Sequence, residues 1–368
     1  MPNLLDTIKS PSDLHRLAVA DLPVLVREVR QRIVDVVSKN QGHLASNLGV
    51  VELTVALHYC FDFQLDRLVW DVGHQSYTHK ILTGRNDRFD TRRQPGGMSG
   101  FPAKPESPYD PFTTGHAGAA VSTALGLACA DAQRDVNRHV VAVLGDGGAT
   151  AGMSFEGLNH AGGLGKRLLV VLNDNCMSIS KTVGGFAEYL NRVRMAPLYA
   201  DLKREVRHLL SLIPVFGKTM EEGLEYLKDA IRRSMVPGQF FEELGFRYFG
   251  PIEGHNTELL VETLRDIKQI DGPVLLHVLT TKGKGFDPAV ADPTKFHSAK
   301  AFEIQNGELK EHPAGGRSYT QCFSDALIQA AECDKRVVGI TAAMPDGTGL
   351  AKFGERFPDR YYDVGNCE

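Results

Sequence analysis

The sequence has few of the residues that cross-link a chain or hold it in a membrane. Its six cysteines are scattered and none forms a Cys-x-x-Cys pair, which argues against a disulfide framework or a structural zinc site. No apolar run approaches the roughly 20 residues that a membrane-spanning helix needs. The N-terminal segment also lacks the charged-then-apolar profile of a signal peptide. We therefore expect a cytoplasmic protein in a reducing compartment, with no membrane partner.

The chain also lacks an excess of positive charge. It has 41 Lys and Arg residues against 45 Asp and Glu residues, a net charge of −4, so we expect no nucleic-acid partner. Hydrophobic residues make up 42% and charged residues 23%, which is typical of a folded globular protein. A length of 368 residues exceeds one ordinary domain core and predicts two domains.

Short apolar runs alternate with stretches of helical spacing along most of the chain. The helical stretches include residues 11–40 and 50–61. The runs that read as strands cover residues 67–73, 139–147, 167–175, 246–254 and 273–285. Runs of this length, rich in Val, Leu and aromatic residues, suit strands that are buried on both faces. The alternation predicts an α/β fold with a doubly wound, mainly parallel sheet and helices on both faces.

The remaining segments divide the chain into domains. Residues 1–297 are predicted to form the sheet domain, with a charged helical excursion at 186–240 that could be an insertion, a cover or helices packed on the sheet. Residues 298–317 are polar and contain Pro and Gly, which predicts an interdomain linker. Residues 318–368 read as helix, strand, helix and the beginning of a strand. We interpret them as the incomplete start of a second α/β domain.

Two of the predicted strands end in oxygen-bearing side chains. Asp146 follows the run VVAVLG, and Asn173, Asp174 and Asn175 follow LLVVL 27 to 29 positions later. This separation fits one strand–helix–strand unit, which brings both strand ends to the same edge of the sheet. A carboxylate and an amide oxygen, without thiol or imidazole, suit a hard cation such as Mg²⁺ or Ca²⁺.

Glycines surround this carboxylate. Gly145, Gly147 and Gly148 would let backbone N–H groups approach a diphosphate that completes the metal shell. The alternative is a dinucleotide-binding turn or a plain loop. GDGGATAG lacks the third glycine of GxGxxG, however, and the second strand ends in asparagines rather than in a ribose-binding acid. The metal–diphosphate interpretation is therefore favoured.

A GDG turn followed at this interval by an Asn-containing strand end resembles the thiamine-diphosphate signature of transketolases and pyruvate dehydrogenases. From about residue 4 to the end, the chain is similar to 1-deoxy-D-xylulose-5-phosphate synthases. The blocks that carry this resemblance are GHLASNLGVVELTVALHYCFD, WDVGHQSYTHKILTGR, GDGGATAGMSFEGLNHAG, VLNDNCMSIS, LTTKGKGF and YYDVG. The resemblance implies a homodimeric transferase that decarboxylates pyruvate on thiamine diphosphate and joins the two-carbon unit to D-glyceraldehyde 3-phosphate. The resulting 1-deoxy-D-xylulose 5-phosphate would be used in isoprenoid, thiamine and pyridoxal biosynthesis.

The resemblance also implies which residues hold the cofactor and its metal ion. Asp146 and Asn175 would ligate Mg²⁺ together with the backbone carbonyl of Met177. The cofactor would be contacted by His74, Gly115, His116, Ala117, Gly147, Gly148, Asn175, Phe286 and Glu368. Ala117 replaces the serine of the family's usual GHS, so its contact would come from the backbone. Phe286 replaces a frequent tyrosine.

Three residues are implied to be catalytic. His43 and His297 would move protons, because imidazoles donate and accept protons near neutral pH. Glu368 would hydrogen-bond the aminopyrimidine ring of the cofactor and favour its imino form. Family members continue past the position of Glu368, so the chain reads as a C-terminally truncated fragment. We expect this polypeptide alone to have little or no activity.

Two alternatives remain open at this point. One is a transketolase-type enzyme or its separately encoded N-terminal subunit, and the other is a non-catalytic relic that still binds thiamine diphosphate. Among the remaining polar residues, Lys282 and Lys284 are predicted to lie on a solvated loop. Thr150 and Ser154 are interpreted as residues near helix starts rather than as nucleophiles.

Overall fold

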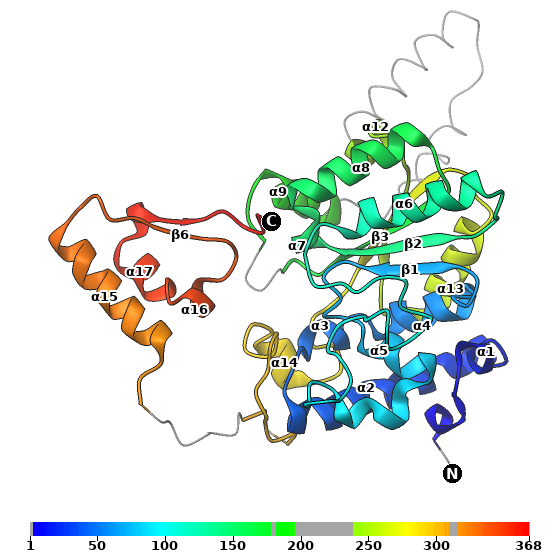
Figure 1. Cartoon of the computed structure of the whole chain (residues 1–368), viewed down its shortest axis with the longest axis horizontal. Coiled ribbons are helices and arrows are strands. Elements are labelled where there is room, and N and C mark those ends of the chain that lie inside the picture. The colour runs from blue at the N-terminus through cyan, green and yellow to red at the C-terminus, as the bar shows by residue number, and fades with distance from the viewer. Residues whose placement is uncertain (1–2, 178–181, 196–237, 306, 309–315, 368) are drawn as a thin grey trace, which may run out of the picture.

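A computed structural model of the chain describes residues 3–177, 182–195, 238–305, 307–308 and 316–367. Five of its strands form one wholly parallel sheet in the order β1-β2-β3-β5-β4 (Figure 1). These strands are β1 (Arg67–Trp70), β2 (Val140–Gly145), β3 (Leu168–Asp174), β4 (Arg247–Glu253) and β5 (Pro273–Leu279). Each strand lies within one of the five predicted apolar runs, so the sequence-based prediction of the sheet is confirmed.

The sheet is buried on both faces, as β3 shows most clearly. Leu169 and Val171 belong to the hydrophobic core on one face, whereas Leu168, Val170 and Leu172 belong to the core on the other. All seven residues of β3 are buried. Side chains alternate between the faces of a strand, so a continuous apolar run is needed when helices cover both sides. The doubly wound α/β fold class is therefore confirmed.

Two layers of helices enclose the sheet (Figure 1). One layer contains α2 (Leu22–Asn40), α4 (Val51–Cys60) and α13 (Thr257–Ile267), and the other contains α6 (Ala120–Gln133), α8 (Gly152–Leu164) and α12 (Gln239–Glu243). Within the described residues, the remaining α-helices of the sheet domain are α1 (Pro11–Leu14), α3 (Ala45–Leu48), α5 (Tyr77–Lys80), α7 (Asp146–Ala149), α9 (Gly185–Met195) and α14 (Asp287–Ala291). Through the described ranges, no helix is both long enough and apolar enough to cross a membrane.

The segment at the C-terminal end forms a small α/β unit of its own. It contains α15 (Tyr319–Cys333), β6 (Gly339–Thr341), α16 (Pro345–Thr348), α17 (Ala351–Arg356) and β7 (Tyr361–Asp363). β6 and β7 pair in parallel around a small core that includes Leu350 and Phe353. After β7 the chain returns to the end of the large sheet near α7 (Figure 1), where Asn366 Nδ2 donates to the carbonyl of Gly147 at 3.3 Å.

The predicted linker differs from the structure in its first half. Ala299 pairs with Gly42 in an antiparallel bridge, and Phe302 is 1% exposed and donates its backbone N–H to the carbonyl of Ser38. Residues 299–302 therefore pack on the sheet domain, because a buried phenylalanine anchors an otherwise polar stretch. Of the excursion predicted at 186–240, residues 196–237 lie outside the described residues, and its role stays open.

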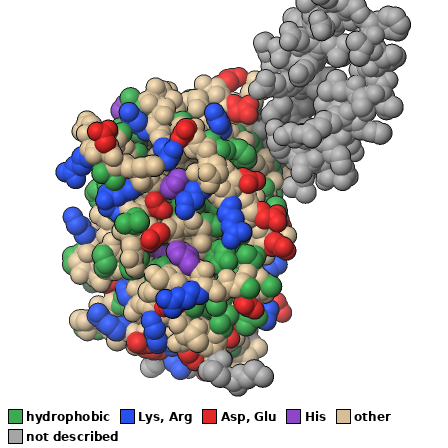
Figure 2. Space-filling view, turned by 90° about the vertical axis from the view of Figure 1, so that its right-hand side faces the viewer, with side chains coloured by type: hydrophobic (Ala, Val, Ile, Leu, Met, Phe, Trp, Pro, Cys, Tyr) green, Lys and Arg blue, Asp and Glu red, His purple; other side chains and the backbone are tan. Residues whose placement is uncertain are grey.

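The surface carries charges of both signs. Figure 2 shows Lys and Arg side chains interspersed with Asp and Glu over the face in view, with no large area of one sign. This distribution agrees with the near-balanced composition and gives no electrostatic argument for a nucleic-acid partner on that face.

Candidate functional site

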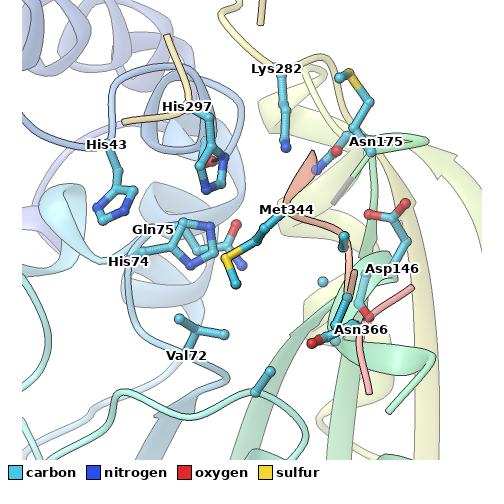
Figure 3. A pocket seen from close by; sticks show the side chains of 18 of the residues that line it. His43, Val72, His74, Gln75, Asp146, Asn175, Lys282, His297, Met344 and Asn366 are labelled. Atoms are coloured by element: carbon cyan, nitrogen blue, oxygen red, sulfur yellow. Dashed lines mark hydrogen bonds between the residues drawn. The ribbon is translucent and has the colours of Figure 1, made fainter. Parts of the chain in front are cut away.

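A cavity of about 380 Å³ opens at the edge of the sheet where β2 and β3 end. Most of the predicted site residues line it: His43, His74, Gly115, Ala117, Asp146, Gly147, Gly148, Asn175, Met177 and His297. Figure 3 shows the histidines on one side of this space and Asp146 with Asn175 on the other. The strand spacing thus brought the two predicted metal ligands to one place, as parallel topology requires.

Two buried oxygen atoms in this cavity have no hydrogen-bond partner among the residues that the structure describes. They are Oδ1 of Asp146, whose residue is 1% exposed, and Oδ1 of Asn175. The other Asp146 oxygen accepts a hydrogen bond from Thr182 Oγ1 at 3.0 Å. Burial, together with the nearby negative charge of Asp174, raises the pKa of Asp146 to about 7.

Unpaired buried oxygens are costly, and a buried carboxylate requires a compensating positive charge. A carboxylate, an amide oxygen and a neighbouring backbone carbonyl are ligands that Mg²⁺ prefers. The residues present therefore fit a hard divalent cation.

The glycine turn after β2 packs against a carboxylate that sequence reasoning did not select. A Cβ on Gly148 would lie 2.2 Å from Oδ2 of Asp71, so only glycine fits there. Asp71 accepts hydrogen bonds from the backbone N–H groups of Gly118, at 3.0 Å, and Ala120, at 3.2 Å. It thereby fixes the loop that carries Gly115 and Ala117 beside the glycine turn. Its position directly after the strand RLVW was the available signal.

Three imidazole rings form a triangle on the opposite wall. The ring centroids of His43, His74 and His297 are 5.3 to 5.4 Å apart. Desolvation, with the charges of Arg93, Arg92 and Lys282, lowers the pKa of His43 to about 4. Desolvation, with Lys282 and His43, lowers the pKa of His297 to about 3. The pKa of His74 also lies well below its usual value, mainly because of desolvation. All three rings are therefore neutral at pH 7, and burial opposes their protonation.

The histidine triangle is held in place by Asn47, a fully buried residue of α3. Its side-chain amide donates to the backbone carbonyls of His43 and His74, both at 2.7 Å, and its oxygen accepts from the N–H of Tyr77 at 2.8 Å. One amide thus joins the loops that carry two of the three histidines. The sequence around Asn47 does not predict this role, because the partners His74 and Tyr77 lie 27 and 30 positions further along the chain.

The prediction of a solvated loop is wrong for Lys282 and agrees with the structure for Lys284. Lys282 is 6% exposed and lines the cavity, whereas Lys284 is exposed. Gly283 adopts a φ of +76° and donates its N–H to the carbonyl of Ala45, which holds the loop against α3. Burial lowers the pKa of Lys282 to about 8, although Asp146 opposes this shift. The cavity therefore contains a cation near the glycine turn.

Two of the predicted site residues that the structure describes do not join this group. His116 is exposed and lies outside the cavity lining. Phe286 packs into the core against Phe296 and Phe302, with ring centroids 5.8 and 5.5 Å away, and also lies outside the lining. Its apolar ring is buried by packing within that aromatic cluster. Glu368 lies outside the described residues.

This parallel sheet, with polar strand ends and a glycine turn at its carboxyl edge, gives the chain an α/β fold that is also found in transketolases. The chain matches a transketolase from Campylobacter jejuni subsp. jejuni NCTC 11168 with a TM-score of 0.55 and 21% identity, over 74% of this chain and 39% of that one. It matches the transketolase of Leishmania mexicana with a TM-score of 0.56 and 19% identity, over 94% and 48%. At such identities the likeness establishes the fold alone.

A narrower assignment comes from sequence. The family model described as 1-deoxy-D-xylulose-5-phosphate synthase matches residues 5–280, and the chain belongs to that family. It is 50% identical to 1-deoxy-D-xylulose-5-phosphate synthase 1 of Geobacter sulfurreducens over the whole of this chain. It is also 50% identical over its whole length to the 1-deoxy-D-xylulose-5-phosphate synthase of Halothermothrix orenii. In both cases the chain spans 58% of the relative's length.

Proposed function

We propose that this chain binds Mg²⁺ and thiamine diphosphate and provides the diphosphate-binding part of a 1-deoxy-D-xylulose-5-phosphate synthase site. The observation that carries the proposal is the pair of unpartnered buried oxygens, on Asp146 and Asn175, beside a glycine turn. The substrates in this proposal are pyruvate and D-glyceraldehyde 3-phosphate, and the active form is a cytoplasmic homodimer. Family membership supports these assignments.

Each wall of the cavity has a part in this function. Asp146, Asn175 and the carbonyl of Met177 hold the metal ion, while backbone N–H groups of Gly147 and Gly148 meet the diphosphate. When bound, the cofactor supplies the electron sink for decarboxylation and carbon–carbon bond formation.

The neutral histidines carry the proton steps in this proposal. His43 and His297 exchange protons with substrate hydroxyls, because they line the cavity as imidazoles that their lowered pKa values keep uncharged at pH 7. His74 contacts the cofactor from the third corner of the triangle. Glu368 has the role on the aminopyrimidine ring that the resemblance implies.

Removing the proposed metal ligand tests the assignment directly. In calorimetric titrations of the chain with thiamine diphosphate, we expect Mg²⁺ to strengthen binding of the wild type. Asp146→Ala is expected to weaken binding in Mg²⁺ by at least about tenfold. Removing a residue that merely hydrogen-bonds a metal ligand already lowers metal affinity by that factor. Asp334→Ala, at a surface ion pair far along the chain, is the control and should bind as the wild type does. Unchanged, Mg²⁺-dependent binding by Asp146→Ala would refute the site.

The two lysines of the TTKGKG loop provide a matched pair. Lys282→Ala should weaken thiamine diphosphate binding by at least about tenfold, because a charge-assisted hydrogen bond to the diphosphate contributes about 1.5 to 3 kcal/mol. Lys284→Ala removes the same charge from an exposed position two residues away and should leave the dissociation constant unchanged. Equal effects of the two substitutions would mean that only long-range charge matters and that Lys282 has no contact with the diphosphate.

A further inference from the structure

A line of buried, hydrogen-bonded side chains lies directly behind the turn that carries Asn175 and Met177. The hydroxyl of Tyr248 lies 2.8 Å from Nδ1 of His277, and Nε2 of His277 lies 2.9 Å from Oδ2 of Asp174. The side chains of Asp174 and His277 are 0% exposed. We propose that this Tyr248–His277–Asp174 array positions the metal-binding turn, with Asp174 as the positioning residue. The inference rests on the Mg²⁺ site of the proposed function.

Asp174 is not available as a metal ligand, because both of its oxygens are engaged within the chain. Oδ2 lies 2.9 Å from His277 Nε2 and 3.0 Å from Nε of Arg194 in α9, and Oδ1 accepts the backbone N–H of Cys176 at 3.2 Å. It is nonetheless close enough to raise the pKa of Asp146. Because both of its oxygens are engaged, Asp174 can position the neighbouring metal ligands but does not itself bind the metal ion.

The hydrogen bond from Cys176 shows what Asp174 supports. Cys176 lies between the two proposed ligands of the turn and has a φ of +65°, in the left-handed region that residues with a Cβ seldom adopt. A non-glycine residue keeps such a conformation only where its surroundings enforce it. The carboxylate of Asp174 does so by accepting the Cys176 N–H. That bond therefore fixes the directions of Asn175 Oδ1 and the Met177 carbonyl.

His277 and Tyr248 in turn fix the carboxylate. Carboxylate oxygens accept hydrogen bonds, so the array assigns the donor role to Nε2 of His277, which faces Oδ2 of Asp174. In that tautomer Nδ1 is the acceptor, and the Tyr248 hydroxyl donates to it. β3 and β5 are adjacent, with Leu172 opposite His277, so the array crosses neighbouring strands without leaving the core. Tyr248 is itself stacked on Phe241, with ring centroids 5.8 Å apart.

The dependence of cofactor binding on metal concentration tests the array. Mg²⁺ is titrated into each variant at a fixed thiamine diphosphate concentration, and thiamine diphosphate is titrated at saturating Mg²⁺. Asp174→Asn should raise the apparent Kd for Mg²⁺ by about 10- to 100-fold, the usual cost of losing a supporting partner. His277→Gln should act in the same direction. At saturating Mg²⁺, the affinity of both variants for thiamine diphosphate should recover, which a general loss of structure would not allow.

Tyr248→Phe provides a milder test in case Asp174→Asn or His277→Gln does not fold. It removes one hydroxyl, and we expect a rise in the Kd for Mg²⁺ of about twofold or more, since one hydrogen bond contributes roughly 0.5 to 1.5 kcal/mol. Tyr59→Phe is the matched control, because the Tyr59 hydroxyl donates to the carbonyl of Leu17, outside the site. A Kd for Mg²⁺ that is the same in Tyr248→Phe, Tyr59→Phe and the wild type would overturn the inference.

Failure of the inference can be told apart from failure of the proposed function. If the wild type shows no Mg²⁺-dependent binding, or Asp146→Ala keeps it, the metal site itself is wrong and the positioning role falls with it. If Asp146→Ala abolishes the dependence while folded Tyr248→Phe and His277→Gln leave the Kd for Mg²⁺ unchanged, the metal site stands and the array does not position it.

Discussion

Asp146→Asn is expected to stabilise the metal-free chain at pH 8 by about 2 to 4 kcal/mol, because each pKa unit corresponds to about 1.4 kcal/mol. We expect the same substitution to remove Mg²⁺-dependent cofactor binding. In the wild type, burial and the nearby charge of Asp174 raise the pKa of Asp146 from 3.8 to about 7, and its Oδ1 has no hydrogen-bond partner within the described part of the chain. Asparagine keeps the shape and the oxygen but carries no charge.

The sign of the pH dependence follows from proton binding. Between about pH 4 and pH 7 the folded wild type holds a proton on Asp146 that the unfolded chain has released. The folded state binds more protons in this window, so the contribution of Asp146 to stability falls as the pH rises through it. Asp146→Asn lacks this loss, and its advantage over the wild type should grow from near zero at pH 4 to its full value above pH 7.

Urea unfolding of the metal-free proteins at several pH values measures this difference. Asp6→Asn, at an exposed position, is the control and should follow the wild-type curve. If Asp146→Asn and the wild type keep a constant stability difference from pH 5 to pH 8, Asp146 does not titrate as the structure requires. Saturating Mg²⁺ and thiamine diphosphate should reverse the ranking, because ligands that bind only the folded wild type stabilise it alone.

The same chemistry explains which features were predictable from sequence. The five strands were found because strands buried on both faces are continuous apolar runs, as in Leu168–Asp174. Parallel topology then places their polar ends at one edge, which brought Asp146 and Asn175 together. Each of these inferences needs only local sequence and one rule of connectivity.

The remaining site residues depend on contacts between distant segments. Asn47 has its role because it donates a hydrogen bond to the carbonyl of His74, 27 positions away. Lys282 points inward because the N–H of Gly283 donates a hydrogen bond to the carbonyl of Ala45. A basic loop in isolation is solvated, so the sequence favoured the wrong environment for Lys282. Phe286 illustrates the opposite case, since packing against two other phenylalanines decides its position. The roles assigned to the site residues stay predictions until binding is measured.

A second large effect is expected at Asp110, which lies in a buried network outside the cavity lining. Its oxygens accept hydrogen bonds from His79 Nε2 at 2.8 Å and from Arg85 at 2.7 and 3.0 Å. Oδ2 also accepts the backbone N–H of Ala103 at 2.9 Å. Although burial opposes it, hydrogen bonds from His79 and Arg85 hold the pKa of Asp110 well below its usual range. Its stabilising contribution is therefore present at neutral pH and is lost only as the pH falls below about 4.

Asp110→Ala should lower the free energy of unfolding at pH 7 by about 3 to 5 kcal/mol, the usual cost of leaving one partner of a buried ion pair uncompensated. Arg85 would keep its charge, and among the described residues its remaining carboxylate partner is the more distant Glu106, at 3.7 Å. Urea unfolding measures the change, and Asp334→Ala, in an exposed ion pair with Arg336, should leave the midpoint unchanged. A loss below about 1 kcal/mol would show that the attraction between Asp110 and Arg85 only offsets the cost of removing both charges from water.

Asp110 also holds the loop that places Phe101 against His43, with ring centroids 5.8 Å apart. Folded Asp110→Ala should therefore bind thiamine diphosphate more weakly even at saturating Mg²⁺.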